Sequence, residues 1–149
     1  MSYLRDLYEA TILDHNRKPR NFLYVPQGVN RHAQGFNPVC NDNFTVHLRV
    51  EDGVIRDAGF EGAGCAISTA SASLMTESIK GKTEAEARSL LQGMHNLLTA
   101  EGDSGDVGKL EVLAGVHEYP MRIKCATLPW HTLRAALDGN DETVTTEPK

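Results

Sequence analysis

Residues 44–61 read FTVHLRVEDGVIRDAGFE, and this stretch decides the fold. Every second residue from Phe44 to Val50 is apolar and the residues between them are polar, which is the pattern of a strand with one buried face. The dipeptide Asp52-Gly53 is typical of a two-residue hairpin turn, so residues 54–61 are predicted to return as a second strand. Because a hairpin brings its open ends together, the residues just before and just after this stretch are expected to lie close in space.

Two of the three cysteines stand at those open ends. The preceding segment, Asn-Pro-Val-Cys-Asn-Asp at residues 37–42, carries Cys40 and Asp42 in a predicted turn. The following Gly-Ala-Gly segment can bend sharply and places Cys65 at the predicted start of a helix, where the helix dipole favours a thiolate. The third cysteine, Cys125, lies far down the chain, just before another predicted helix.

The rest of the chain is predicted to be mainly helical. Helices are predicted over residues 2–16, 66–80, 107–116 and 126–138, and a further one begins at the capping box of Thr83 and Glu86. Residues 17–36 contain two prolines and two glycines without a sustained period and are predicted to be a loop. Cys125 is predicted to cap the last helix, with Pro129 near its first turn.

This order of elements indicates an α+β fold, in which a small antiparallel β-sheet packs against helices. We predict one domain over residues 1–139. The polar residues 140–149 cannot bury apolar surface and are predicted to be a disordered tail.

Composition narrows the class of protein. The 149 residues carry a formal net charge of −5, which gives no electrostatic basis for binding nucleic acid or an anionic membrane. The N-terminus lacks an apolar run long enough for a signal peptide, so we expect a cytoplasmic protein. Three cysteines is an odd number, and reduced thiols in the cytosol serve metal binding or catalysis more often than disulfides.

Three interpretations of the cysteines stay open on these residues alone. Cys40, Asp42, Cys65 and Cys125 would together complete a tetrahedral zinc site, since zinc accepts thiolates and a carboxylate. Alternatively, the cysteines are unrelated small buried residues. A catalytic cysteine–histidine pair is the third interpretation, although nothing selects one pair. The six histidines are interpreted as surface or loop residues: His15, His32, His47, His95, His117 and His131.

Four segments resemble the U-type iron–sulfur assembly proteins of the IscU/NifU N-terminal-like superfamily. They are Asn37–Asp42, Gly64–Ser68, Lys80–Thr83 and Arg122–Leu128. The sequence is similar to the SufU branch more than to the IscU scaffold branch. Lys124 precedes the last cysteine where the scaffold branch typically has histidine, and an extra stretch lies around Gly93 to Lys109.

The resemblance implies a zinc-dependent sulfurtransferase with a SufE/NifU-like fold. It implies that Cys40, Asp42, Cys65 and Cys125 bind zinc, that Cys40 accepts sulfur, and that Arg122 helps to dock the partner. The implied donor is a pyridoxal-phosphate-dependent cysteine desulfurase of the SufS type, and the receiver is a downstream iron–sulfur assembly scaffold. Asn41 replaces the glycine common in the family, and asparagine tolerates a left-handed backbone better than other non-glycine residues.

We hypothesise that a histidine of the desulfurase displaces Cys40 from zinc and so frees its thiolate to take up sulfur. The alternative function is a scaffold on which a [2Fe–2S] cluster is built, because iron also binds thiolates.

Overall fold

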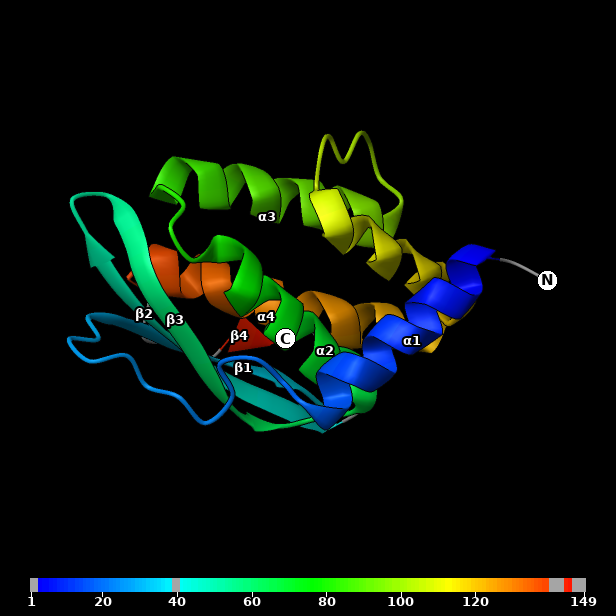
Figure 1. The fold of residues 1–149 in the computed structure, drawn as a ribbon, viewed down its shortest axis with the longest axis horizontal. Helices are drawn as coiled ribbons and strands as arrows, with labels where there is room; N and C mark the ends of the chain where they lie inside the picture. Colours follow the sequence, from blue (N-terminus) through cyan, green and yellow to red (C-terminus); the bar gives the residue numbers. More distant parts are fainter. Residues whose placement is uncertain (1–2, 39–40, 140–143, 146–149) are drawn as a thin grey trace.

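The computed structural model describes residues 3–38, 41–139 and 144–145. The elements in order are α1 (Tyr3–Arg17), β1 (Arg31–Asn37), β2 (Asp42–Glu51), β3 (Val54–Ala63), α2 (Ala66–Ile79), α3 (Glu84–Thr99), the 3₁₀ helices η1 (Gly108–Glu118) and η2 (Pro120–Arg122), α4 (Ile123–Leu137) and β4 (Val144–Thr145) (Figure 1). The predicted α+β fold is confirmed, with one sheet in the order β3-β2-β1-β4.

The predicted hairpin is present as β2 and β3, paired antiparallel. Asp52 and Gly53 have φ angles of 54° and 73°, and two positive values are what a type I′ turn requires. Both strands run further than predicted, because Asn43 still pairs with Ala63 at the open end. The ladder therefore holds Asp42 beside the segment that leads to Cys65.

The prediction of a loop over residues 17–36 is wrong at its end, where β1 pairs antiparallel with β2. The strand is hard to find in the sequence because the residues it buries are Ala33, Gly35 and Asn37, two of them small and one polar. A Cβ on Gly35 would lie 2.0 Å from Thr132 Oγ1, so the glycine lets β1 approach α4 closely.

Within the predicted tail, residues 140–149, the structure describes only Val144 and Thr145. They form β4, which pairs parallel with Gly35 and Phe36 of β1. The physical reason is that β1 is otherwise an open edge, and two β-branched residues suit such an edge. The other tail residues lie outside the described ranges.

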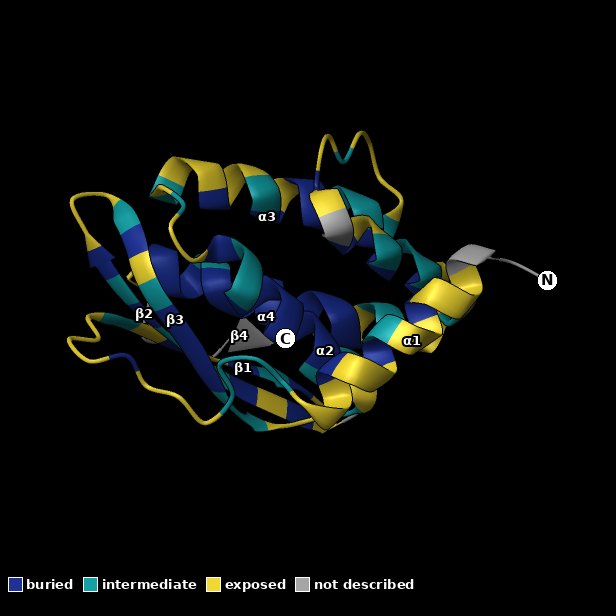
Figure 2. Ribbon diagram, viewed as in Figure 1, coloured by how far each residue is buried: buried dark blue, intermediate teal, exposed yellow. Residues whose placement is uncertain are grey.

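The helices form a layer on one face of the sheet (Figure 2). Helix α4 contacts β1 and β2, and α2 contacts β3 and α4, so both helices are largely buried. Helix α3 packs on α4, and α1 packs along α2. The predicted capping box of Thr83 and Glu86 is confirmed at the start of α3. The segment predicted as a helix over residues 107–116 is the 3₁₀ helix η1, with Leu110 and Leu113 buried as expected.

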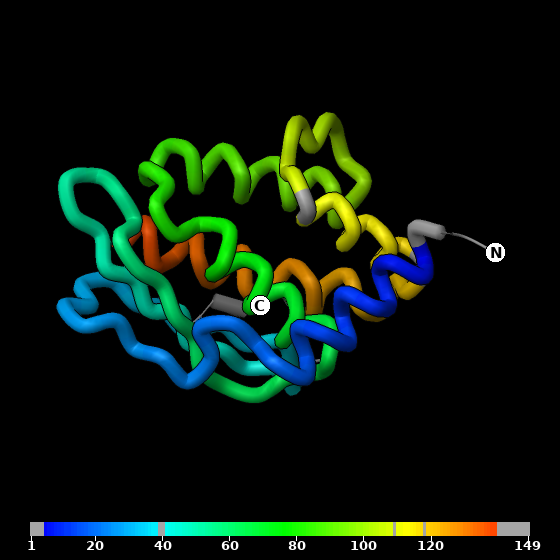
Figure 3. The backbone as a smooth tube through the Cα atoms, viewed as in Figure 1, coloured from blue at the N-terminus to red at the C-terminus, as the bar shows by residue number. Residues whose placement is uncertain are grey.

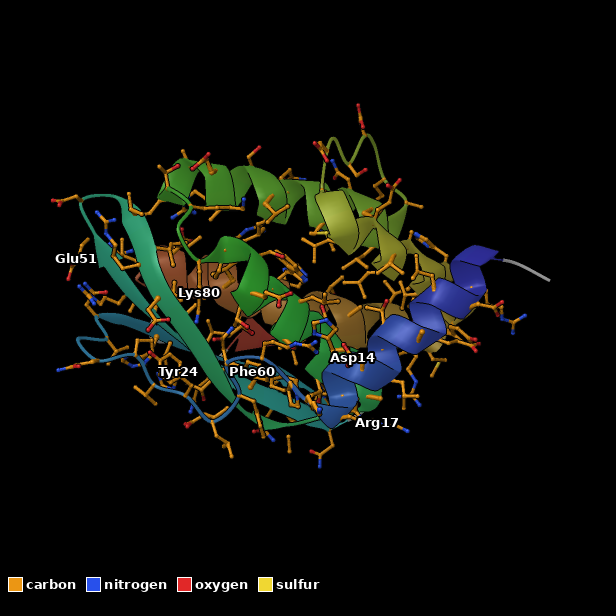
Figure 4. All side chains as sticks on the ribbon, in the orientation of Figure 1. Asp14, Arg17, Tyr24, Glu51, Phe60 and Lys80 are labelled. Atoms are coloured by element: carbon orange, nitrogen blue, oxygen red, sulfur yellow. The ribbon has the colours of Figure 1, made fainter. Side chains whose placement is uncertain are left out.

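The chain between α1 and β1 lies along the free edge of β3 (Figure 4). The backbone N–H of Leu23 donates to the Phe60 carbonyl at 2.8 Å, and the N–H of Phe60 donates to the Asn21 carbonyl at 3.0 Å. Lys80 Nζ is 5.4 Å from the centre of the Tyr24 ring and adds a cation–π contact. This segment occupies hydrogen-bonding groups that an open edge would offer to another chain. None of the helices in the described part of the chain is both long and apolar enough to cross a membrane.

Candidate metal centre

Three of the four predicted metal ligands meet at one end of the sheet. The ligand atoms of Asp42, Cys65 and Cys125 all lie within 4.8 Å of one another. In Figure 3 the chain leaves β3 at this end and passes directly into α2. Asp42 is the first residue of β2, Cys65 precedes α2, and Cys125 lies in the first turn of α4. Cys40 lies outside the described residues.

Cys65 is the N-cap of α2, as its sequence position predicts. Its backbone is extended (φ −73°, ψ 171°), and the Ser68 N–H donates to its sulfur at 3.5 Å. Gly64 is required beside it, because an added Cβ would lie 2.4 Å from Ser68 Oγ and 2.9 Å from Asp42 Oδ1. Sequence and packing together thus aim a half-buried sulfur at the cluster.

The prediction that Cys125 caps α4 is wrong. The helix begins at Ile123 with Arg122 as its N-cap, because the 3₁₀ turn that starts at Pro120 runs on into α4. Pro129 therefore lies inside the helix, four residues after Cys125, where it has no N–H to donate to the Cys125 carbonyl. Cys125 itself is fully buried.

Asp42 is a fully buried carboxylate with both oxygens hydrogen-bonded. The Cys65 N–H donates to Oδ1 at 2.8 Å, and Asn37 Nδ2 donates to Oδ2 at 3.3 Å. Within residues 3–38, 41–139 and 144–145, no lysine, arginine or histidine forms an ion pair with it. Burying a carboxylate without a cation is costly, whereas a buried carboxylate beside two thiols is a donor set that suits zinc.

The two described sulfurs influence each other. A hydrogen bond from Cys125 lowers the pKa of the Cys65 thiol to about 5, and hydrogen bonds from Ser68 act in the same direction. Burial and the negative charge of Asp42 oppose this shift but are outweighed. Cys65 is therefore a thiolate at neutral pH, which is the form that binds metal.

Histidine takes no part in the cluster that the described residues form. The interpretation of His15 as a surface residue is wrong, because its ring is buried and its Nδ1 lies 2.8 Å from Ser73 Oγ. His95 and His131 pack edge to face with ring centres 6.1 Å apart, and they come from α3 and α4. These contacts are structural, and they leave the thiols and Asp42 as the donor set.

Arg122 is exposed at the start of α4, three residues before Cys125. It lines a groove of about 470 Å³ between α1, the start of α2 and η2. The other lining residues are mainly apolar: Tyr8, Glu9, Ile12, Leu13, Asn16, Ala66, Ile67 and Tyr119. One of these lining residues, Ala66, directly follows Cys65 in the chain, so the groove reaches the neighbourhood of that cysteine. The docking role of Arg122 stays a prediction.

Sequence reasoning missed Asn37 as a member of the site. It is fully buried and pairs with Asp42 across the β1–β2 ladder. Its amide Nδ2 lies 3.3 Å from Asp42 Oδ2 and 3.5 Å from Cys125 Sγ. The signal available in the sequence was its place at the head of the segment that carries Cys40 and Asp42. Asn41, which precedes Asp42 in that segment, has the predicted left-handed backbone, with φ of 58°.

Comparison with known proteins shows the family of this chain. Residues 7–126 match the family described as the NifU-like N terminal domain. The chain is 39% identical over 132 residues to the zinc-dependent sulfurtransferase SufU of Bacillus subtilis (strain 168), covering 87% of this chain and 88% of that protein. It is 45% identical over 136 residues to the iron–sulfur cluster assembly scaffold protein IscU of Thermotoga maritima, covering 88% and 92%.

A solved structure has the same fold. It is the iron–sulfur cluster assembly scaffold protein for the SUF system from Fervidobacterium islandicum AW-1, with a TM-score of 0.76 and 34% identity over 85% of this chain and 93% of that one. Since the family match spans most of the chain, the protein belongs to the NifU-like N-terminal domain family of iron–sulfur cluster assembly proteins.

Proposed function

We propose that this protein is a zinc-dependent sulfurtransferase of the cytoplasm. It takes persulfide sulfur from a cysteine desulfurase of the SufS type and passes it to iron–sulfur cluster assembly. The observation that carries the proposal is the group of Asp42, Cys65 and Cys125, in which Asp42 and Cys125 are fully buried and the ligand atoms lie within 4.8 Å of one another. The similarity to a protein named as a zinc-dependent sulfurtransferase supports the same activity.

Cys40, Asp42, Cys65 and Cys125 would hold the metal, which would supply positive charge that keeps the thiols ionised and restrains their reactivity. We assign sulfur acceptance to Cys40. Pro38 and Asn41, its nearest described neighbours, are both exposed, whereas Cys125 is fully buried and Cys65 is fixed by α2. A partner protein can therefore approach this segment without moving the core.

The proposed transfer is an exchange between sulfur atoms without net oxidation. The Cys40 thiolate attacks the terminal sulfur of the donor's persulfide and forms a new S–S bond. The old S–S bond breaks, and its electron pair leaves with the donor cysteine as a thiolate. Cys40 is left as a persulfide, which a later acceptor thiol can attack in the same way.

Zinc content and coordination test the metal part of this proposal. Protein purified without added metal is expected to carry about one zinc per chain, with three sulfur ligands and one oxygen ligand by X-ray absorption. A site with nitrogen in place of oxygen would remove Asp42 from the shell. Protein that carries iron, and no zinc, after purification without oxygen would favour the second candidate.

That second candidate is a scaffold for a [2Fe–2S] cluster. Relatives at up to 45% identity among those described above carry a scaffold name, and two thiolates with a carboxylate also suit iron. Lys124 supports the sulfurtransferase instead, since it stands where the scaffold branch typically has histidine. Anaerobic reconstitution with iron and sulfide separates the two, because only a scaffold should retain a cluster through gel filtration.

Arg122 is the residue we propose for docking the desulfurase. Its exposure and its place on the groove beside Cys65 would let it contact a partner without disturbing the buried cluster. Arg122→Ala is expected to keep its zinc and to weaken activation of the desulfurase, visible as a higher concentration for half-maximal activation. Lys124→Ala, another exposed cation two residues away, is the matched control. Identical titration curves for Arg122→Ala and wild type would rule this role out.

A further inference from the structure

Asn37 stands between two of the proposed metal ligands. It is fully buried at the end of β1, and its ladder partner on β2 is Asp42. One atom, Nδ2, lies 3.3 Å from Asp42 Oδ2 and 3.5 Å from Cys125 Sγ. A side-chain amide nitrogen carries two N–H donors, so it can serve both acceptors at once.

The carboxylate of Asp42 is held from both sides as a result. Its Oδ1 accepts from the Cys65 N–H and its Oδ2 accepts from Asn37, which fixes the plane of the carboxylate. Each described sulfur also has its own donor, because Ser68 serves Cys65 and Asn37 serves Cys125. The amide therefore links a ligand on β2 to a ligand on α4.

We propose that Asn37 is a positioning residue that orients Asp42 and Cys125 for metal binding. The inference rests on the proposed metal site. Hydrogen-bonding partners of metal ligands typically change metal affinity by about 10- to 100-fold when removed.

The test compares Asn37→Ala with Asn43→Ala. Asn43 also adjoins Asp42, but its side chain is exposed on the other face of the strand, so it is a matched control. Zinc dissociation constants are measured by competition with a chromophoric chelator, and the cobalt(II)-substituted proteins are compared by their sulfur-to-cobalt and ligand-field absorption bands. Asn37→Ala should bind zinc about 10- to 100-fold more weakly and shift the cobalt bands, while Asn43→Ala matches wild type.

Unchanged cobalt bands together with unchanged zinc affinity in Asn37→Ala would overturn the inference. A purely structural role would lower thermal stability and leave the cobalt bands in place, which also overturns it. Asn37→Ser keeps a polar group in the buried site but is too short to reach both acceptors, so it is expected to show the same loss if Asn37→Ala fails to fold. Failure of the proposed site is separately visible, because wild-type protein would then hold zinc no better than Asp42→Ala.

Discussion

Replacing Cys40 with alanine is expected to abolish sulfur acceptance while the protein stays folded. Cys40 belongs to the connection between β1 and β2, whereas Cys65 and Cys125 are tied to α2 and α4. Its loss therefore removes no side chain from the helices of the core. We expect Cys40→Ala to keep more of its zinc than the other two cysteine variants.

The measurement is mass spectrometry of the intact protein and its peptides after incubation with desulfurase and cysteine. Wild-type protein should gain the mass of one sulfur on the peptide that contains Cys40, and Cys40→Ala should gain none. Circular dichroism and zinc content are recorded on the same samples. If Cys40→Ala gains sulfur on Cys65 or Cys125 at the normal rate, the acceptor is one of those cysteines and Cys40 is only a ligand.

The second large effect is expected from Cys125→Ala, which should lose zinc and much of its stability. Cys125 is fully buried in α4, and the free energy of binding a structural zinc contributes to folding. Without the metal, Asp42 becomes a buried carboxylate without a cation, and leaving a buried charge uncompensated costs about 3–5 kcal/mol. This corresponds to a fall in melting temperature on the order of 10 °C. Cys65→Ala should behave in the same way.

Wild-type protein stripped of metal by a chelator is the matched control for this prediction. If stability is lost through the metal, stripped wild type and Cys125→Ala should melt at similar temperatures, and added zinc should restore only the wild type. A variant that melts well below stripped wild type would show that packing of the thiol in α4 matters more than the metal. Retention of one zinc by Cys125→Ala would exclude this cysteine from the ligand shell.

The parts of the fold that the sequence predicts are those with local patterns. Alternation of apolar residues around Asp52-Gly53 identifies the hairpin, and Thr83 with Glu86 identifies the start of α3. The meeting of Asp42 with Cys65 follows from the hairpin, because its two ends must be neighbours. The meeting of both with Cys125 rested on resemblance, since α4 comes from a distant part of the chain.

The features that sequence reasoning missed depend on contacts between distant elements. Strand β1 turns Ala33, Gly35 and Asn37 inward, and no hydrophobic period marks such a strand. Position 35 has no room for a residue larger than glycine, because Thr132 of α4 lies against it. Cys125 lies inside the first turn of α4 and not at its cap, since the helix begins at Ile123 as a continuation of the 3₁₀ turn that starts at Pro120.

The separation of the site's residues along the chain has a consequence for protein synthesis. Asp42 and Cys65 are 23 positions apart, whereas Asn37 and Cys125 are 88 positions apart. At about 5–20 residues per second, roughly 4–18 s pass on the ribosome between the addition of Asn37 and that of Cys125. A two-stranded hairpin is only marginally stable in water. Asp42 and Cys65, at the ends of the hairpin, are therefore not held in a complete site until α4 has been synthesised and has packed against the sheet. A nascent chain truncated before α4 would carry thiols without a closed site, and tight zinc retention would therefore mark only chains whose synthesis had passed this helix.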